Sequence, residues 1–413
     1  MNKKSNKIIS LTIKFLSYVI AAIIILNCNT VYITSNNFEI LNKIILPILI
    51  VATIIYTFCS ILKYNLKFDK TLLLGIGVTG YISIYVILSA ALSSNLIGLR
   101  IILYFIIFFM LAWVEKNEAQ LSNILIAYIK LMFLIALVSI FFWLFGSYLH
   151  FIAPTGNTTI NWGAPNRNVP SYYNLYFETQ SFDIGIRNSA IFAEAPMAAL
   201  NFLIALSLSV LFPIKGKFNI IKVITFVIAG LMTMSTAMYI GILIILTFKL
   251  FQNGKKTRLL SYTLGIILIP IMVKLIYTMF NAKMDTNSGL DRKVDYLNAF
   301  TVWSNHIFMG AGINAGVNEG INVINGERIL HYGFSSSFTK ILGDGGLFLL
   351  LLIILALSMS IIKSFKEKNY NRLIFTVILA YLFMVIIFAQ SYLMFYLFIF
   401  VAIWTPKKII KKL

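Results

Sequence analysis

Charge is scarce in this chain, and acidic charge most of all. Only 12% of the 413 residues are charged, and 14 of them are Asp or Glu. A soluble domain carries about 25% charged residues, so a soluble protein of ordinary composition is excluded. Cysteine is almost absent as well. Cys28 and Cys59 lack the spacing of metal ligands or of a disulfide framework, which excludes a structure built on either.

The chain is instead rich in long apolar runs. Hydrophobic residues make up 60% of it, and windows of about 20 apolar residues are the signature of membrane-spanning helices. We therefore predict an all-α, polytopic membrane protein of about 12 spans, folded as one integral membrane domain over residues 1–413. The expected spans lie near 8–27, 42–62, 71–92, 98–114, 121–145, 189–212, 220–234, 237–251, 259–279, 345–363, 372–388 and 390–404.

The net charge of +20 does not indicate a nucleic-acid partner, because the lysines cluster in short gaps between apolar runs. Such clusters are typical of cytoplasmic loops, which predicts that both termini are cytoplasmic. The first run follows a basic start and lacks a small-residue cleavage site, which is typical of a retained signal anchor.

Two long loops, at 146–187 and 280–343, are then predicted to lie on the outer side of the membrane. They hold half of the acidic residues and all three histidines. Because function usually sits in loops carried on a rigid scaffold, we expect the active site there.

The seven arginines are distributed differently from the lysines. Arg258 and Arg372 fit cytoplasmic loops, whereas the other five fall on the outer side. Arginine offers a planar fork that matches phosphate, so we expect Arg100 and Arg187, each beside a span, to bind an anion. The remaining three are Arg167, Arg292 and Arg328. Arg167 is expected to pair with a loop acid instead, and the same alternative stands for Arg328.

The stretch RNSAIFAEAP places Glu194 at the start of an apolar run. Pro196 favours a helix that begins there, which would put Glu194 beside the positive end of the helix dipole. A helix starting at Ser189 would instead place Glu194 about two turns beyond Arg187. A structural ion pair and a catalytic base both remain open for Glu194.

The second loop contains a predicted helix and a glycine-rich turn. Val294, Leu297, Phe300 and Trp303 recur at helical spacing, which indicates an amphipathic helix, either on the outer membrane surface or packed as an ordinary loop helix. GAGINAG (310–316) fits a dinucleotide-binding pattern only formally, because it is expected outside the membrane, where nicotinamide cofactors are scarce, and it is interpreted as a tight turn.

Three segments resemble the Wzy-type polysaccharide polymerases and O-antigen ligases. RNSAIFAEAPMAA is similar to their Arg-x-x-Gly-x-Phe-x-Glu-Pro segment, HIFMGAGINAG to their Asn-Pro-x-x-Gly-x-Gly segment, and LHYGFSSSFTKILGDGGLFLLLL to the end of their His-rich loop. The chain departs at Ser235-Thr236, where the family often has Ser-Arg. The spacing from His331 to Gly343 also differs by one residue from the ligases, which favours a polymerase.

The resemblance implies a GT-C-like glycosyltransferase of the bacterial plasma membrane, acting on its outer side. Such enzymes transfer a growing glycan from undecaprenyl pyrophosphate to a new lipid-linked repeat unit, beside a flippase and a chain-length regulator. Glu194 and His331 become candidate catalytic residues, with Asp295 a weaker one. Arg100, Arg187, Arg292 and Arg328 become candidate pyrophosphate ligands. No cofactor or metal is expected, because arginines stabilise the leaving group and no ligand cluster is visible.

A transporter of lipid-linked oligosaccharide is the alternative from another class. It would be expected to show two matching halves and charged residues near the membrane midplane. No such halves are evident in the sequence.

Overall fold

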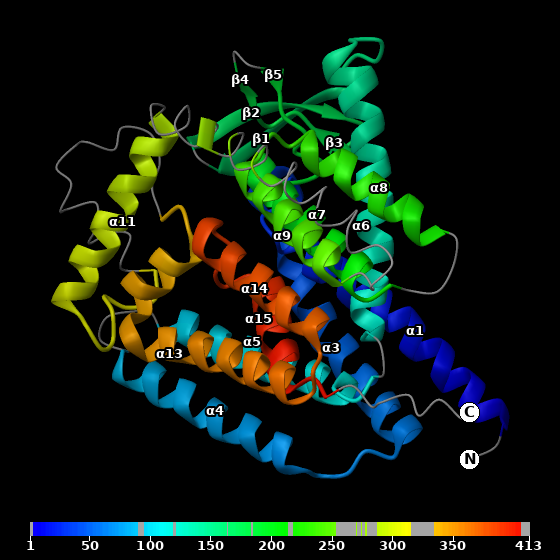
Figure 1. Ribbon diagram of the computed structural model, residues 1–413, viewed down its shortest axis with the longest axis vertical. Coiled ribbons are helices and arrows are strands. Elements are labelled where there is room, and N and C mark those ends of the chain that lie inside the picture. Colours follow the sequence, from blue (N-terminus) through cyan, green and yellow to red (C-terminus); the bar gives the residue numbers. More distant parts are fainter. Residues whose placement is uncertain are drawn as a thin grey trace.

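The structure is a computed structural model that describes residues 3–89, 95–118, 121–162, 164–182, 185–213, 218–252, 270, 274, 277–278, 287–314 and 334–405. The described part is mostly helical, with 74% of its residues in helices and a few short strands (Figure 1). Within the described residues, six helices are long and apolar enough to cross a membrane, and five apolar helices are shorter. The chain is thus a multi-pass membrane protein, as predicted.

Eleven helices of the described residues overlap expected spans, with ends that differ by up to eight residues, and the others are short or lie in the second long loop. The helices are α1 (Lys3–Leu26), α2 (Val31–Thr34), η1 (Asn36–Phe38), α3 (Glu39–Tyr64), α4 (Lys70–Leu88), α5 (Asn95–Glu115), α6 (Asn123–Phe142), η2 (Trp143–Tyr148), α7 (Ala195–Leu211), α8 (Phe218–Leu231), α9 (Thr236–Gln252), α11 (Asn287–Asn305), α13 (Ser337–Lys366), α14 (Tyr370–Val385) and α15 (Tyr392–Ile403). The expected span at 259–279 lies almost wholly outside the described residues.

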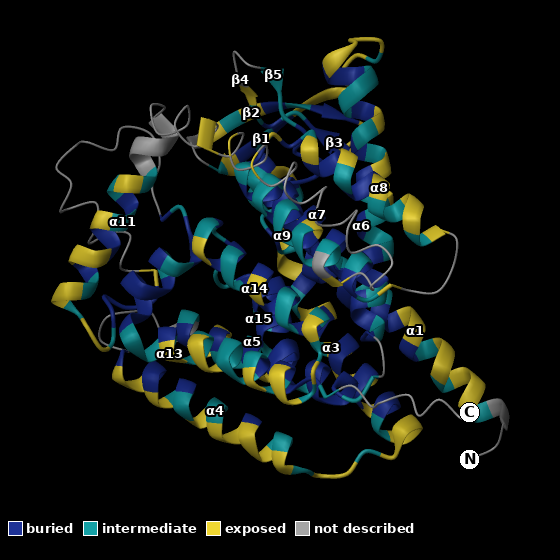
Figure 2. Cartoon of the chain, viewed as in Figure 1, coloured by how far each residue is buried: buried dark blue, intermediate teal, exposed yellow. Residues whose placement is uncertain are grey.

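Helix α7 forms the centre of the bundle. All of its residues are buried except Pro196 and Val210, whereas α3 and α4 expose large apolar side chains on their outer sides (Figure 2). A helix that is apolar all round belongs in the interior of a membrane protein, while outer helices turn apolar side chains toward lipid. The central position of α7 therefore determines where Glu194, the residue just before this helix, lies in the bundle.

Successive helices alternate in direction, so that their ends meet in two groups. At one end, the start of α15 bonds to Asn27 after α1 (Tyr392 N to Asn27 Oδ1, 2.9 Å), and Ser337 N of α13 bonds to the Ile386 carbonyl after α14 (3.0 Å). Both described parts of the long loops lie at this end, which we call the sheet end. The opposite, basic end carries Lys63, Lys67, Lys116, Lys363 and Lys366.

The first long loop corrects the all-α prediction. Three antiparallel strands, β1 (Gly156–Trp162), β2 (Ala164–Tyr172) and β3 (Tyr176–Phe177), form one sheet, and β4 (Ser181–Phe182) pairs with β5 (Gly185–Ile186). Alternate residues of β1 point inward, and Ile160 packs with Val169, Phe177 and Val31 of α2. This period-two burial is what a half-buried strand requires.

Helix α13 is broken at Gly346, whose φ of 55° is outside the helical range. Residues 307–312 run beside the break and bond to it, as in Leu347 N to the Ile307 carbonyl (3.0 Å) and Gly312 N to the Asp344 carbonyl (3.0 Å). A Cβ on Gly310 would lie 2.5 Å from the Asp344 carbonyl, so only glycine fits there. The predicted tight turn is confirmed at 310–312, and residues 315–316 lie outside the described part.

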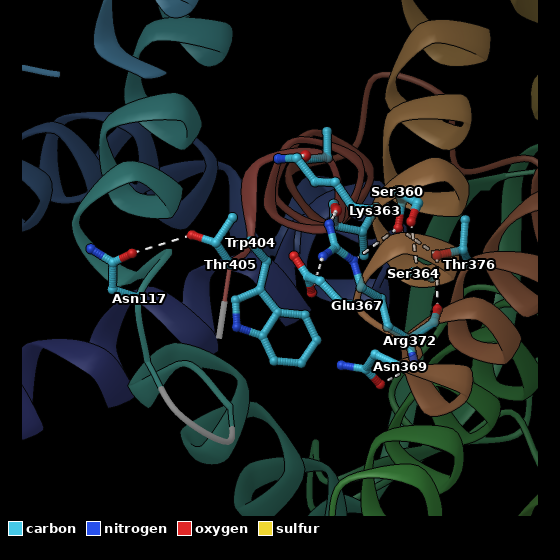
Figure 3. A network of polar contacts seen from close by, with 12 residues as sticks. Asn117, Ser360, Lys363, Ser364, Glu367, Asn369, Arg372, Thr376, Trp404 and Thr405 are labelled. Atoms are coloured by element: carbon cyan, nitrogen blue, oxygen red, sulfur yellow. Dashed lines mark hydrogen bonds and ion pairs between the residues drawn. The ribbon is translucent and has the colours of Figure 1, made fainter. Parts of the chain in front are cut away.

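Arg372, which is fully buried at the start of α14, connects the helices at the basic end (Figure 3). Its guanidinium donates to the Val401 carbonyl (2.6 Å) and to Ser360 Oγ (3.3 Å), and pairs with Glu367 at 3.4 Å. One side chain therefore ties α13, α14 and α15 together. Because Arg372 supplies these bonds to other helices, it has a structural role rather than that of a loop charge.

Candidate functional site

Glu194 stands at the mouth of the central helix. It is the N-cap of α7, with extended backbone (φ −154°, ψ 154°), and Pro196 occupies the first turn. This arrangement confirms the first of the two predicted helix starts. The N–H of Ala195 bonds to Gln180 Oε1 at 3.1 Å rather than to the Glu194 side chain. The carboxylate therefore lies beside the positive helix end without serving as its cap.

The segment before Glu194 is fixed by buried polar side chains. Asn188 is fully buried, its N–H bonds to the Met232 carbonyl at 3.0 Å, and its Nδ2 donates to Ser139 Oγ at 3.1 Å. Its Oδ1 accepts from the N–H of Ala190, which has a left-handed φ of 50°. These bonds hold an irregular backbone in one conformation, so residues 187 and 194 keep a fixed separation.

Arg187 is held by two hydrogen bonds from its guanidinium. Nε donates to the Thr233 carbonyl at 2.7 Å, in the turn between α8 and α9, and Nη1 donates to Gln180 Oε1 at 3.2 Å. Gln180 also receives the Ala195 N–H, so one amide oxygen joins Arg187 to the start of α7. Burial lowers the pKa of Arg187 to about 10, while nearby Glu194 opposes the shift. Arg187 is therefore still a cation at neutral pH.

Arg167 also points toward Glu194, which the sequence analysis did not anticipate. It lies opposite Ile160 in the β1–β2 pair, on the inner face of the sheet. Its Nη2 donates to the Ala193 carbonyl at 3.4 Å, and its Nε is buried with no hydrogen-bond partner. Burial lowers its pKa, and Glu194 is the acid whose charge opposes this. Several loop acids lie outside the described side chains, so the expected pairing of Arg167 with a loop acid stays a prediction.

Arg292 reaches the same place from α11 in the second long loop. Its charge acts on Glu194 and on Arg187, so the side chain lies close to both. Arg167, Arg187 and Arg292 come from three separate segments and converge on one carboxylate. Three cationic side chains therefore share the surroundings of Glu194.

Helix α11 turns its polar side inward. The buried positions are Asp295, Asn298, Ala299 and Val302, whereas Leu297 is 60% and Phe300 46% exposed. At the same time, α11 packs against α13, and Trp303 lies against the apolar core, as in a packed loop helix. A membrane protein turns polar residues toward its interior or a polar cavity and apolar ones toward lipid. The exposed face of α11 suits the outer membrane surface.

The environment of Glu194 favours its neutral form. The side chain is only partly exposed, and poor solvation of the carboxylate raises its pKa, against a hydrogen bond from Trp162 and the charges of Arg187, Arg292 and Arg167. A carboxylate whose pKa is raised toward neutrality suits a group that takes up a proton.

The remaining predicted site residues are Arg100, Asp295, Arg328 and His331. Arg100 is exposed near the start of α5, at the sheet end, within electrostatic range of Tyr392. Asp295 is fully buried in α11. Arg328 and His331 lie outside the described residues, so the structure does not test their roles.

Metal ligands do not gather at this site in the described part of the chain: no three His, Cys, Asp or Glu side chains there are close enough to share an ion. Comparison with models of protein families and with curated proteins gives no match for this chain.

Proposed function

We propose that this protein is a membrane glycosyltransferase that polymerises undecaprenyl-pyrophosphate-linked repeat units into a capsular or O-antigen-type polysaccharide. The observation that carries the proposal is the cluster of three arginines around Glu194 at the sheet end. Three guanidinium groups in one place fit a substrate with more than one negative charge, and a pyrophosphate carries at least two. The guanidinium groups of the three arginines match phosphate oxygens in geometry as well as in charge.

The chemistry follows from the roles of these groups. The acceptor hydroxyl attacks the anomeric carbon of the donor glycan, and the bond from that carbon to the pyrophosphate oxygen breaks. Glu194 takes the hydroxyl proton, and the arginines stabilise the charge that develops on the departing lipid pyrophosphate. The energy comes from the donor bond, so the reaction requires no nucleotide.

An O-antigen-ligase-type transfer uses the same donor and differs in its acceptor. A transporter of lipid-linked oligosaccharide is favoured by one observation, the break in α13. Beside the break, Asp344 is 2% exposed and pairs with Lys340 at 2.8 Å, and broken helices with buried charges occur at transport sites. The arginines, however, lie at one end of the bundle, where an enzyme acting on one side of the membrane needs them.

The direct test is polymer formation by the purified protein from lipid-linked repeat units in detergent. We expect a ladder of longer lipid-linked glycans, and we expect it to persist in EDTA, because arginines rather than a metal ion stabilise the leaving group. Loss of the ladder in EDTA with recovery on adding a divalent ion would contradict this mechanism. Movement of repeat units across proteoliposomes without any new glycosidic bond would favour the transporter.

The orientation is tested by cysteine labelling in a chain lacking Cys28 and Cys59. We expect Asn157→Cys, at an exposed position of β1, to react with a membrane-impermeant maleimide in intact cells. Lys366→Cys, exposed at the basic end, serves as the matched control and should react only after permeabilisation. The reverse pattern would place the arginine cluster in the cytoplasm and contradict the proposed reaction.

A further inference from the structure

Two lysines lie inside the apolar helices near the basic end, far from the arginine cluster. Lys130 of α6 donates to the hydroxyl of Tyr18 in α1 at 3.1 Å, and its ammonium is 5.7 Å from the centre of that ring. Lys222 of α8 lies within electrostatic range of both Lys130 and Tyr18. Helix α6 packs against both α1 and α8 (Figure 1). The three helices thus bring two ammonium groups and a phenol within electrostatic range of one another.

The depth of this place follows from helix geometry. Lys222 is four residues from the start of α8 and Lys130 seven residues from the start of α6. At 1.5 Å per residue, their Cα atoms lie about 6 Å and about 10 Å inside the helix ends. Flexible lysine side chains reach outward from such depths to the boundary between headgroups and acyl chains.

Nothing on these helices neutralises the two lysines. The sequences of α1, α6 and α8 contain no Asp or Glu, and Lys14 adds another cation one turn from Tyr18 on the same side of α1. Two ammonium groups repel each other, the more so where water is scarce. Lysines that only extend toward the membrane surface would point apart, whereas Lys130 turns toward Tyr18 and lies close to Lys222. An anion between them would remove the repulsion.

We propose that Lys130, Lys222 and Tyr18 bind the phosphate of an anionic phospholipid in the leaflet at the basic end. All three side chains are partly exposed, as a site open to the bilayer requires. The lysines contribute charge, and the Tyr18 hydroxyl contributes a hydrogen bond. A zwitterionic lipid carries its own ammonium group, which would repel the lysines, so the site selects lipids with net negative charge. This site is separate from the glycosyltransfer site and does not depend on that proposal.

The test is the thermal stability of the purified protein in neutral detergent during titration with a short-chain phosphatidylglycerol. We expect a saturable rise in melting temperature. The apparent affinity should fall about fivefold for Lys222→Gln and about 30-fold for Lys130→Gln/Lys222→Gln, since each basic side chain near a charged lipid contributes on this scale. The single variant keeps the test valid if the double variant does not fold.

Matched controls separate the outcomes. Lys249→Gln/Lys366→Gln removes the same charge from the same end of the bundle, outside the proposed site, and should keep the affinity of the unaltered protein. Short-chain phosphatidylcholine and inorganic phosphate are the alternative ligands. An equal rise with phosphatidylcholine, an equal rise with inorganic phosphate, or an unchanged affinity in Lys222→Gln would each overturn the proposal.

Discussion

Arg187→Ala is expected to lower polymer formation by about 10²- to 10³-fold per folded molecule, the usual effect of removing one group that stabilises developing negative charge. Arg187→Lys should recover only part of the activity. A lysine replaces the charge but cannot donate at once in the directions of Thr233 and Gln180, as Nε and Nη1 do. The measurement is the initial rate of repeat-unit coupling by purified protein, normalised to its monodisperse fraction.

Loss of stability is the competing explanation, and it has its own control. Removing Arg187 leaves the Thr233 carbonyl without its donor, at a cost of about 1–3 kcal/mol. Arg372→Gln removes a buried arginine from carbonyl and hydroxyl partners at the opposite end, so it should lower stability while the rate per folded molecule stays unchanged. If Arg187→Ala is rescued by adding Glu194→Gln, Arg187 serves as a structural partner rather than as a substrate ligand.

The helices were predictable because lipid imposes a simple rule on them. A spanning segment must satisfy its backbone bonds internally and bury apolar side chains, which leaves long apolar runs in the sequence. Even finer features followed from local chemistry: Pro196 correctly indicated where α7 begins, and the chain turns between α8 and α9 close to the expected division between the spans 220–234 and 237–251. The break in α13 was not predicted, because its cause is the approach of residues 307–312, over 30 positions away.

The sheet in the first long loop was missed although its signal was present. Thr158 and Ile160 alternate with polar neighbours, but the segment is short. The sequence of β2 contains Pro165 and Pro170, which obscure its strand pattern. This omission had a consequence for the site. Without the pairing of β1 with β2, Arg167 had no reason to share a face with Ile160, and pairing with a nearby acid was the simpler expectation. Residues brought together by long-range pairing leave no local pattern in a single sequence.

Glu194→Gln is expected to produce the other large effect, a fall in coupling rate of about 10²- to 10⁴-fold at neutral pH, as for loss of a general base. The substitution keeps the shape of the side chain and removes its ability to accept a proton. Glu178→Gln is the matched control: it changes an acid of the same loop, partly exposed and bonded to the Tyr172 hydroxyl, outside the arginine cluster. Its rate should match that of the unaltered protein.

The Glu194→Gln substitution should affect the stability of the protein differently from its activity. Because the pKa of Glu194 is raised in the folded protein, the folded state holds this proton more tightly than the unfolded state does. Its contribution to stability is then present below the unfolded pKa, near 4.3, and is lost as the pH rises through the raised folded pKa. At neutral pH the ionised group therefore costs stability, so Glu194→Gln should melt at the same or a higher temperature.

The pH dependence of the rate completes the test. Coupling by the unaltered protein should rise with pH through the folded pKa of Glu194, with an acid limb shifted upward from that of an ordinary glutamate. The residual rate of Glu194→Gln should lack that limb, whereas Glu178→Gln should keep it. A general base predicts an inactive, stable variant without the limb. If Glu194 instead forms a structural ion pair with the surrounding arginines, the Glu194→Gln variant should be destabilised, and its folded fraction should couple repeat units at the normal rate. In that case the carboxylate stabilises the fold and takes no part in proton transfer.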